Sequence, residues 1–250
     1  MLPAERRDFL LERLARDGKL VAKHLAAELD LSEDSVRRDL RDLAAAGLAQ
    51  RVYGGVLPAS PAVGSLETRA TISVEGKQRV ATLAARLVKP GMTVILDGGT
   101  TTLAVASALP RDLDATIVTH SPTIAAALVG LPDLEIYVIG GRVFKHSAVT
   151  SGAAAAEAAA GISADLFLLG VTGVHEHAGL TTGDADEAAM KRLLSRRSAE
   201  TWVLASAEKI GAASPFTVLP LGEVAGVITD AEGDNPTVVA LQRAGVTVRR

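Results

Sequence analysis

A run of glycine and threonine follows a short apolar segment near the middle of the chain. The sequence Val-Ile-Leu-Asp-Gly-Gly-Thr-Thr-Thr covers residues 94–102, so an expected strand ends at Asp97 and a helix opens at the threonines. Glycines let a backbone approach a ligand closely, and free N–H groups at a helix start, with threonine hydroxyls, can hold a phosphate. A tight strand-to-helix turn with threonine caps is the alternative, and these residues alone leave both interpretations open. The run is neither a Walker loop nor Gly-x-Gly-x-x-Gly.

Polar or glycine-rich turns also follow the next apolar segments, at residues 119–121, 140–142 and 170–173. Ligands of open parallel sheets bind outside the carboxyl ends of the strands, so we expect these turns to converge on the glycine-threonine loop. Lys191 and Lys209 are placed to add positive charge there. A solvated surface position is the alternative for each lysine.

Residues 183–191, Gly-Asp-Ala-Asp-Glu-Ala-Ala-Met-Lys, bring three carboxylates close to a lysine. Such a group could transfer protons on a sugar phosphate, or its carboxylates could cap the helix that begins near Asp184. His175 and His177 form a His-x-His pair. Because the chain has no Cys and no further His nearby, we expect a solvent loop there, and we expect no metal and no cofactor.

The first 57 residues follow the pattern of a helix-turn-helix: two short helices, a tight break and a third helix that ends near Gly47. The third helix carries polar side chains away from its apolar face, and one more arginine lies in the hairpin beyond it. These candidate DNA-binding residues are Ser35, Arg37, Arg38, Arg41 and Arg51. Arginine can bind guanine or phosphate, and serine can reach either. A solvated helix face is the alternative, because the segment's 10 basic and 10 acidic residues cancel.

The remaining chain predicts an α/β architecture. Residues 58–74 begin with an uncharged stretch of Pro, Ala, Ser and Gly, which is typical of a linker. Beyond it, short apolar strands alternate with helices, which indicates a mostly parallel sheet. We expect strands near 93–97, 115–120, 134–141, 164–171, 200–206 and 226–230, and helices near 75–88, 101–109, 123–128, 153–160 and 187–198. Phe167 and Trp202 are core candidates.

Composition excludes several classes of protein. The chain has 250 residues, of which 48% are hydrophobic and 3% aromatic, with no Cys and a net charge of −3. The absence of Cys removes zinc fingers, thiol catalysis and disulfide frameworks, and so few aromatics argue against recognition by base stacking. No apolar run is long enough for a membrane span, and the charged N-terminus does not fit a signal peptide. We therefore expect a cytoplasmic protein without a membrane partner.

The run Ser-Glu-Asp-Ser-Val-Arg-Arg-Asp-Leu-Arg-Asp-Leu-Ala-Ala-Ala-Gly-Leu-Ala-Gln-Arg-Val-Tyr-Gly-Gly-Val, residues 32–56, resembles the N-terminal signature of the DeoR family of bacterial repressors. In that family two arginines followed by Asp-Leu open the recognition helix, and a Gly-Leu-x-x-Arg-x-x-Gly-Gly wing follows. Ser35 stands where the family more often has threonine. The resemblance implies that Asp39 is structural and orients an arginine.

The motifs from about residue 75 to 230 resemble the effector-sensing half of the same family, including Leu-Asp-Gly-Gly-Thr-Thr-Thr, Val-Thr-His-Ser and Leu-Ala-Ser-Ala-Glu-Lys. That half is similar in fold to ribose-5-phosphate isomerase and coenzyme A transferases. The resemblance implies a pocket for a phosphorylated sugar. The effector-binding residues that we expect on this basis are Asp97, Gly98, Gly99, Thr100, Thr101, Thr102, His120, Ser121, Gly141, Glu187, Lys191 and Lys209. Two positions depart from the family pattern, because His120 replaces asparagine and Ser206 replaces aspartate.

These observations together predict a homo-oligomeric repressor of sugar catabolism genes that binds double-stranded operator DNA and is released by a phosphorylated sugar. The expected domains are a winged helix-turn-helix at 1–57, a linker at 58–74 and a sensor at 75–250. Two alternatives are an isomerase-like enzyme and a DNA-binding protein whose C-terminal half only oligomerises. We expect no enzymatic activity, because an enzyme does not need an N-terminal DNA-binding domain.

Overall fold

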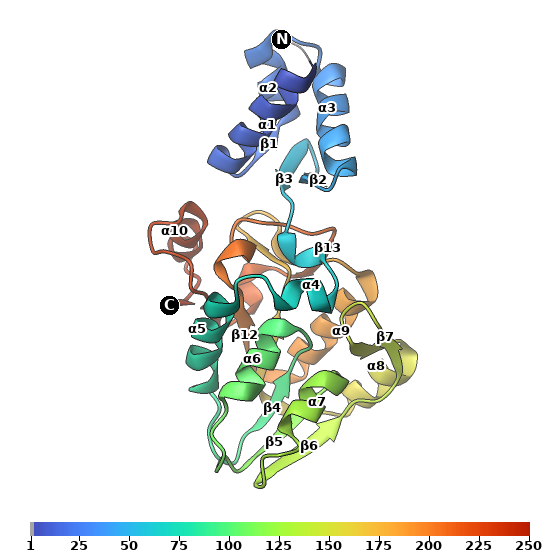
Figure 1. Cartoon of the computed structure of the whole chain (residues 1–250), viewed down its shortest axis with the longest axis vertical. Helices are drawn as coiled ribbons and strands as arrows, with labels where there is room; N and C mark the ends of the chain where they lie inside the picture. The colour runs from blue at the N-terminus through green and yellow to red at the C-terminus, as the bar shows by residue number, and fades with distance from the viewer. Residues whose placement is uncertain (1–2) are drawn as a thin grey trace.

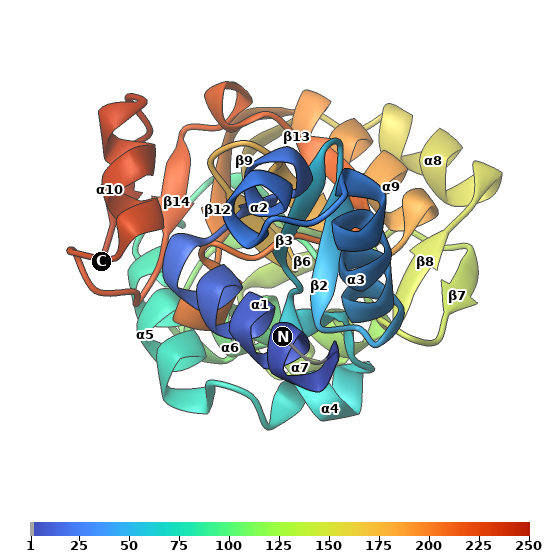
Figure 2. The same ribbon diagram turned by 90° about the horizontal axis from the view of Figure 1, so that it is seen from above.

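The computed structural model describes residues 3–250, in which a small N-terminal domain stands above a larger α/β domain (Figure 1). The small domain packs three helices against a three-stranded antiparallel sheet of order β1-β3-β2. Its elements are α1 (Pro3–Asp17), β1 (Leu20–Val21), α2 (Ala22–Leu29), α3 (Glu33–Ala45), β2 (Ala49–Val52) and β3 (Gly55–Pro58). The predicted winged helix-turn-helix is thus confirmed, and Figure 2 shows its helices from above.

Local sequence explains these elements well. Ser32 caps α3, because its hydroxyl accepts a hydrogen bond from the Ser35 N–H at 3.2 Å. Val36, Leu40 and Leu43 lie on one face of α3 and are buried in the core of this domain. At the wing, a Cβ on Gly55 would lie 1.8 Å from the carbonyl oxygen of Leu20, so only glycine permits the close approach of β1 and β3.

The larger domain is built on a seven-stranded sheet of order β15-β14-β12-β9-β4-β5-β6, in which every pairing is parallel. The strands are β4 (Thr93–Leu96), β5 (Ala115–Thr119), β6 (Leu134–Val138), β9 (Ala164–Gly170), β12 (Ser198–Leu204), β14 (Gly226–Ile228) and β15 (Val248–Arg249). This confirms the predicted α/β class.

Helices cover both faces of this sheet. One face packs on α5 (Val74–Ala85), α6 (Thr100–Ala108) and α7 (Pro122–Leu128), and the other on α8 (Ala153–Ala160), α9 (Ala185–Arg196) and α10 (Pro236–Arg243). Side chains alternate along each strand, so Val94 and Leu96 enter the first core and Ile95 the second. Phe167 and Trp202 are buried, as expected.

Two small antiparallel sheets complete the domain. One pairs β10 (Gly173–His175), β11 (Gly179–Thr182) and β13 (Phe216–Leu219), and the other pairs β7 (Arg142–Phe144) with β8 (Val149–Ser151). The 3₁₀ turns η2 (Ala207–Lys209) and η3 (Leu221–Glu223) flank β13. The prediction of a solvent loop for His175 was wrong: this residue belongs to β10 and is 4% exposed, because the β10–β11 hairpin folds it inward.

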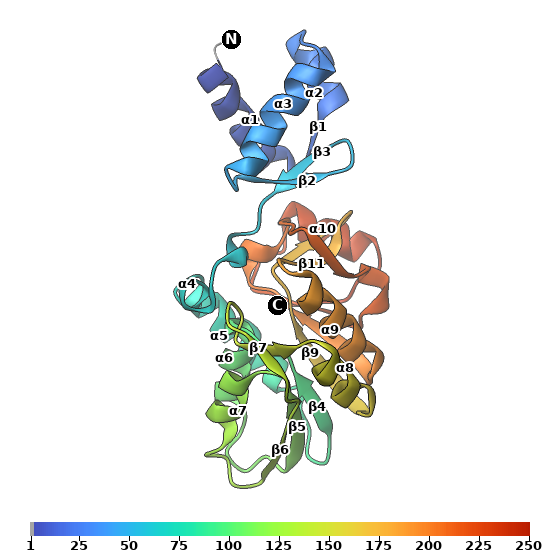
Figure 3. The same ribbon diagram turned by 90° about the vertical axis from the view of Figure 1, so that its right-hand side faces the viewer.

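The segment predicted as a linker is folded onto the larger domain. It contains a 3₁₀ turn η1 (Pro61–Val63) and a short helix α4 (Leu66–Ala70), and it descends from the small domain along one side (Figure 3). Ser65 caps α4 by accepting from the Thr68 N–H. The Leu66 N–H also donates to the carbonyl oxygen of His146 at 3.0 Å. Among the residues that the structure describes, no helix is long and apolar enough to cross a membrane.

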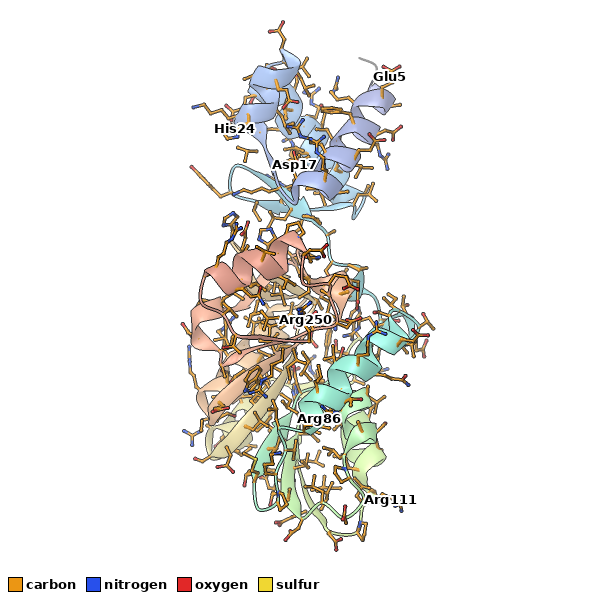
Figure 4. The ribbon with its side chains drawn as sticks, turned by 90° about the vertical axis from the view of Figure 1, so that its left-hand side faces the viewer. Glu5, Asp17, His24, Arg86, Arg111 and Arg250 are labelled. Atoms are coloured by element: carbon orange, nitrogen blue, oxygen red, sulfur yellow. The ribbon has the colours of Figure 1, made fainter. Side chains whose placement is uncertain are left out.

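The carboxyl ends of the parallel strands face the small domain. Arg111, which precedes β5, lies at the end of the larger domain farthest from the small one (Figure 4). The strand β5 therefore runs from that end toward the small domain, and its parallel neighbours run the same way. Ligand sites of such sheets lie outside the carboxyl ends of the strands. A ligand site at this edge would therefore lie between the core of the larger domain and the small domain.

Candidate functional site: an anion pocket and a DNA-facing groove

Sheet register brings the predicted pocket residues together. Leu96 of β4 pairs with Leu168 and with Thr119, so Asp97 emerges beside Gly170 and His120 at the carboxyl edge. A pocket opens above this edge, and the whole loop 98–102 lines it. Glu187, Lys191 and Lys209 line the same pocket.

Asp97 lies beneath the pocket and is fully buried. Its Oδ1 atom accepts from the Gly98 N–H and lies 2.9 Å from Nε2 of His120, and its Oδ2 atom accepts from Lys191 Nζ at 2.5 Å. Burial alone raises the pKa of this carboxyl, but Lys191 and His120 outweigh burial and lower the pKa of Asp97 to about 2. Asp97 is therefore a fixed anion that holds Lys191 at the pocket wall.

Lys209 has no such partner. Its Nζ donates to the hydroxyl of Thr101 at 2.9 Å, and no carboxylate within the described chain lies within 4.0 Å of it. The side chain is 5% exposed, and burial lowers the pKa of Lys209 to about 8. The ammonium sits at the first turn of α6, where backbone N–H groups have no helical acceptor. Positive charge and free donors meet here, which is the chemistry of an anion site.

The candidate DNA-binding residues lie around a groove between α3 and the wing. Arg37, Arg38, Arg41 and Arg51 line this groove, and Tyr53 at its rim is fully exposed. Arg37 forms an exposed ion pair with Glu33 at 2.7 Å, and because solvent screens this contact a phosphate can replace it. Ser35 lies outside the groove lining and shares a hydroxyl contact with the N-cap residue Ser32.

Asp39 contacts α1 and faces away from this groove. Its two carboxylate oxygens accept from Nε and Nη2 of Arg6 at 2.6 and 3.0 Å. This bidentate pair ties α3 to α1. The expectation that Asp39 orients an arginine is confirmed, and Arg6 is that arginine.

Both parts of the chain match described families. Residues 6–61 match the DeoR-like helix-turn-helix domain, and residues 72–231 match the DeoR C terminal sensor domain. The chain belongs to the DeoR family. It is therefore a transcriptional regulator with a DNA-binding domain and a sensor domain.

Similar proteins span nearly the whole chain. The HTH-type transcriptional regulator GlpR of Haloferax volcanii is 34% identical, with 99% of this chain and 98% of that protein covered. The HTH-type transcriptional repressor GlcR of Bacillus subtilis is 30% identical, with 98% and 95% covered. Among solved structures, ribose 5-phosphate isomerase A from Methanocaldococcus jannaschii aligns with a TM-score of 0.39 at 19% identity, covering 53% of this chain and 52% of that one.

Sequence reasoning missed three charged residues of this DeoR-family pocket. Arg69 comes from α4, Lys77 from α5 and Glu208 from η2, and all three line the pocket. Arg69 was missed because it lies in the expected linker. Glu208 directly precedes Lys209, so the motif around Lys209 offered a signal for it.

Two of these residues carry unpartnered atoms. Arg69 Nε and Glu208 Oε2 are the buried side-chain nitrogen and oxygen atoms without a hydrogen-bond partner in the part of the chain that the structure describes. The other Glu208 oxygen accepts from the Ser206 hydroxyl at 2.7 Å. Ser206 stands where the family usually has aspartate. Its hydroxyl orients the carboxylate of Glu208, so the pocket still contains a carboxylate near this position.

Four expected effector residues do not line the pocket, namely Asp97 beneath it, His120, Ser121 and Gly141. His120 is buried behind it between Asp97 and the carbonyl oxygen of Thr150, and Ser121 donates to the carbonyl oxygen of Ala148. Gly141 is exposed and packs near α8 and β8: a Cβ there would lie 3.1 Å from Ala155 of α8 and 3.4 Å from the carbonyl oxygen of Ser151 of β8. His120 and Ser121 therefore support the pocket floor, whereas Gly141 lies apart from it.

The three carboxylates of residues 183–191 have separate roles. Asp184 caps α9 and accepts from the N–H groups of Asp186 and Glu187, both at 3.0 Å. Asp186 is exposed, and only Glu187 lines the pocket, with Oε2 3.4 Å from the Thr182 hydroxyl. The capping interpretation of Asp184 is confirmed, and the three carboxylates do not form one group around Lys191.

Proposed function

We propose that this DeoR-family regulator is a cytoplasmic repressor of sugar catabolism genes that leaves its operator when a phosphorylated sugar binds the sensor pocket. One observation carries the proposal: a buried guanidinium donor of Arg69 and a buried carboxylate acceptor of Glu208, both without partners, line the same pocket. Buried polar groups without partners cost free energy. A ligand with an anionic group and a hydroxyl satisfies both atoms at once.

Charge supports a phosphate as the anionic group. Lys209, which is buried, and Arg69, which is half-buried, bring two positive charges that have no carboxylate of a described residue within 4.0 Å, and the first turn of α6 adds backbone donors. A phosphate monoester carries about 1.5 to 2 negative charges at neutral pH. An uncharged sugar would leave both cations without an anion in direct contact.

The DNA half of the proposal rests on the groove between α3 and the wing. One such domain makes few base contacts, so operator specificity needs a symmetric homo-oligomer. Exposed Tyr137 and Val138 on the edge strand β6 support pairing between copies, because an unpaired apolar strand edge favours association. The oligomeric state is measured by light scattering on the full chain.

The test combines a ligand screen with a DNA-binding assay. Thermal shifts of the full-length protein are recorded with glucose 6-phosphate, fructose 1-phosphate, glycerol 3-phosphate, ribose 5-phosphate, the unphosphorylated sugars and inorganic phosphate. Fluorescence anisotropy then follows release of labelled DNA from upstream of the protein's own gene. We expect a phosphorylated compound to stabilise the protein and to weaken DNA binding by about 5- to 150-fold.

Three results would contradict this proposal. If no phosphorylated compound stabilises the protein, the alternative of a C-terminal half that only oligomerises is favoured. If a compound stabilises the protein but does not change its DNA affinity, ligand binding in the pocket does not regulate DNA binding. Turnover of ribose 5-phosphate, followed by its conversion to the ketose, would establish the isomerase alternative.

A further inference from the structure

The guanidinium of Arg69 bridges two walls of the sensor pocket. Its Nη2 donates to the Ser147 hydroxyl at 3.2 Å in the loop between β7 and β8. Its Nη1 lies on the opposite side, 3.8 Å from where a Cβ of Gly99 would stand at the start of α6. Arg69 therefore reaches across the pocket from a segment that joins the two domains.

This guanidinium has no negative partner of its own. Within the described chain no carboxylate lies within 4.0 Å of it, and its Nε has no hydrogen-bond partner. Burial lowers the pKa of Arg69, and the more distant charges of Glu187 and Asp97 act in the other direction. Arginine stays charged in proteins, so an anion between Arg69 and the α6 N-terminus gives this half-buried charge the direct partner that it lacks.

Lys77 helps to hold the backbone around Arg69 on the sensor domain, as does the hydrogen bond from the Leu66 N–H to the carbonyl oxygen of His146. Lys77 Nζ donates to the carbonyl oxygens of Arg69 and Ile72, the latter at 2.6 Å. At the other end of the segment, the Ser60 N–H donates to the carbonyl oxygen of Ala213, and the Ala213 N–H donates to that of Pro58. Because Pro58 is the last residue of the wing strand β3, few residues separate the pocket wall from the wing.

The space in the pocket is too small for a sugar phosphate. It amounts to about 30 Å³, which is room for one or two water molecules, whereas ligand sites enclose about 300–1,000 Å³. A wall must therefore move when a ligand enters. The floor consists of sheet ends and helix starts, while Ala62, Arg69 and Ile72 belong to the segment between the domains.

A second cavity lies on the other side of the same segment. It has a volume of about 370 Å³ and is lined by Gly47 and Gln50 of the DNA-binding domain and by Phe144 of the sensor. Arg69 lines both cavities. Displacement of the segment around Arg69 therefore changes the space between the sensor and the DNA-binding domain.

We propose that Arg69 binds the anionic group of the effector, and that residues 61–72 thereby act as a movable wall that transmits ligand binding to the wing. This inference rests on the proposed function, because it deepens the role of the same pocket. Loss of Arg69 is expected to weaken anion binding and to uncouple it from DNA release. Operator affinity without ligand is measured for each variant, so that release by ligand is compared with that variant's own starting affinity.

The first experiment compares full-length wild type with Arg69→Met and with the control Arg86→Met, an exposed arginine after α5 (Figure 4). Calorimetry with inorganic phosphate and with the best compound of the screen measures affinity, and anisotropy measures operator binding. We expect Arg69→Met to bind both compounds about tenfold more weakly or worse, because a charge-assisted contact is lost. Ligand should release Arg69→Met from the operator less than it releases wild type, and Arg86→Met should behave as wild type in both assays.

The second experiment follows the segment directly. The chain contains no Cys, so a single environment-sensitive dye can be attached to Val63→Cys on the exposed face of η1, with Gly130→Cys as the control position. Phosphate should change the signal at residue 63 and leave that at residue 130 constant. Unaltered phosphate affinity in Arg69→Met, or a silent dye at residue 63 while phosphate binds, would overturn the inference. Absence of any phosphate or sugar-phosphate binding by wild type would instead remove the proposed function itself.

Discussion

The carboxylate of Asp97 lies 2.5 Å from the ammonium of Lys191, and the sensor domain encloses the pair almost completely. The family resemblance places Asp97 among the effector ligands, but both of its oxygens are occupied by Lys191, His120 and the N–H groups of Gly98 and Gly170. Its role is to keep a positive charge at the pocket wall. A ligand then encounters Lys191 already oriented.

Replacing Asp97 by asparagine should destabilise the protein strongly. Asp97→Asn keeps the shape but leaves Lys191 as a buried charge without a partner, and such changes cost about 3–5 kcal/mol. The double variant Asp97→Asn, Lys191→Met removes both charges and should recover part of that loss. Urea denaturation measures the free energy of unfolding of each variant. Equal stability of the single and double variants would show that the two residues do not depend on each other.

The buried charge of Lys209 should lower the stability of the folded protein, although it favours binding of an anionic ligand. The pKa of Lys209 is about 8 in the folded chain, below its ordinary 10.5, because burial disfavours the charged form. The folded chain thus holds fewer protons than the unfolded chain between these pH values, and stability decreases as pH falls through this window. Below pH 8 the full cost remains, roughly 3 kcal/mol. Lys209→Met should therefore unfold at higher urea concentration than wild type at pH 7.

Anion affinity should depend on pH through the same group. A bound phosphate favours the charged ammonium, so affinity should fall as pH rises above about 8, with a slope approaching tenfold per pH unit. A phosphate monoester loses its second proton near pH 6 and does not titrate in this range. Calorimetry between pH 7 and 9.5 provides the measurement, and Lys209→Met should bind weakly without this slope. An identical slope in that variant would assign the titration to another group.

Elements whose signals are local could be predicted from the sequence. The apolar face of α3 and its cap at Ser32 lie within a few residues of each other, and the glycine-threonine turn after β4 is contiguous. These parts were predicted close to their observed bounds. The convergence of Lys191 and Lys209 on that turn followed from the geometry of parallel sheets.

Features that depend on distant segments could not be predicted in this way. Arg69 acquires its setting because the segment that carries it folds back over the strand ends, where it meets Ser147 from a loop 78 residues away. The burial of His175 depends on pairing between the short strands β10 and β11. Neither contact produces a recognisable pattern in the sequence around Arg69 or His175.

The glycine of the wing should be indispensable for the fold of the DNA-binding domain. A methyl group at residue 55 would overlap the carbonyl oxygen of Leu20, a backbone atom that cannot turn aside. Gly55→Ala should therefore separate β1 from β3 and expose the core to solvent, whereas Gly130→Ala, which meets no atom within 4 Å, should have little effect. Hydrogen exchange on the full chain should locate faster exchange in residues 18–58. Protection equal to wild type there would show that the two strands tolerate a side chain.

The arginines of α3 should carry DNA recognition despite the neutral charge of their domain. Arg37 and Arg38 are exposed on the groove, and Arg38 forms no ion pair within 4.0 Å with a described residue. Each lost base contact costs about 1–3 kcal/mol, so Arg37→Ala, Arg38→Ala should weaken operator binding by about 30-fold or more. Arg111→Ala, at the far end of the sensor (Figure 4), removes one positive charge without touching this groove and serves as the control.

Salt dependence separates the kinds of contact that these arginines make. The logarithm of affinity falls with the logarithm of salt concentration, and the slope decreases by about 1 for each phosphate contact removed. An arginine that reads a base instead relaxes sequence preference at one position. Anisotropy titrations at several salt concentrations, on the operator and on unrelated DNA, measure both quantities. Normal operator affinity of the double variant at physiological salt would show that α3 does not read the operator through this pair.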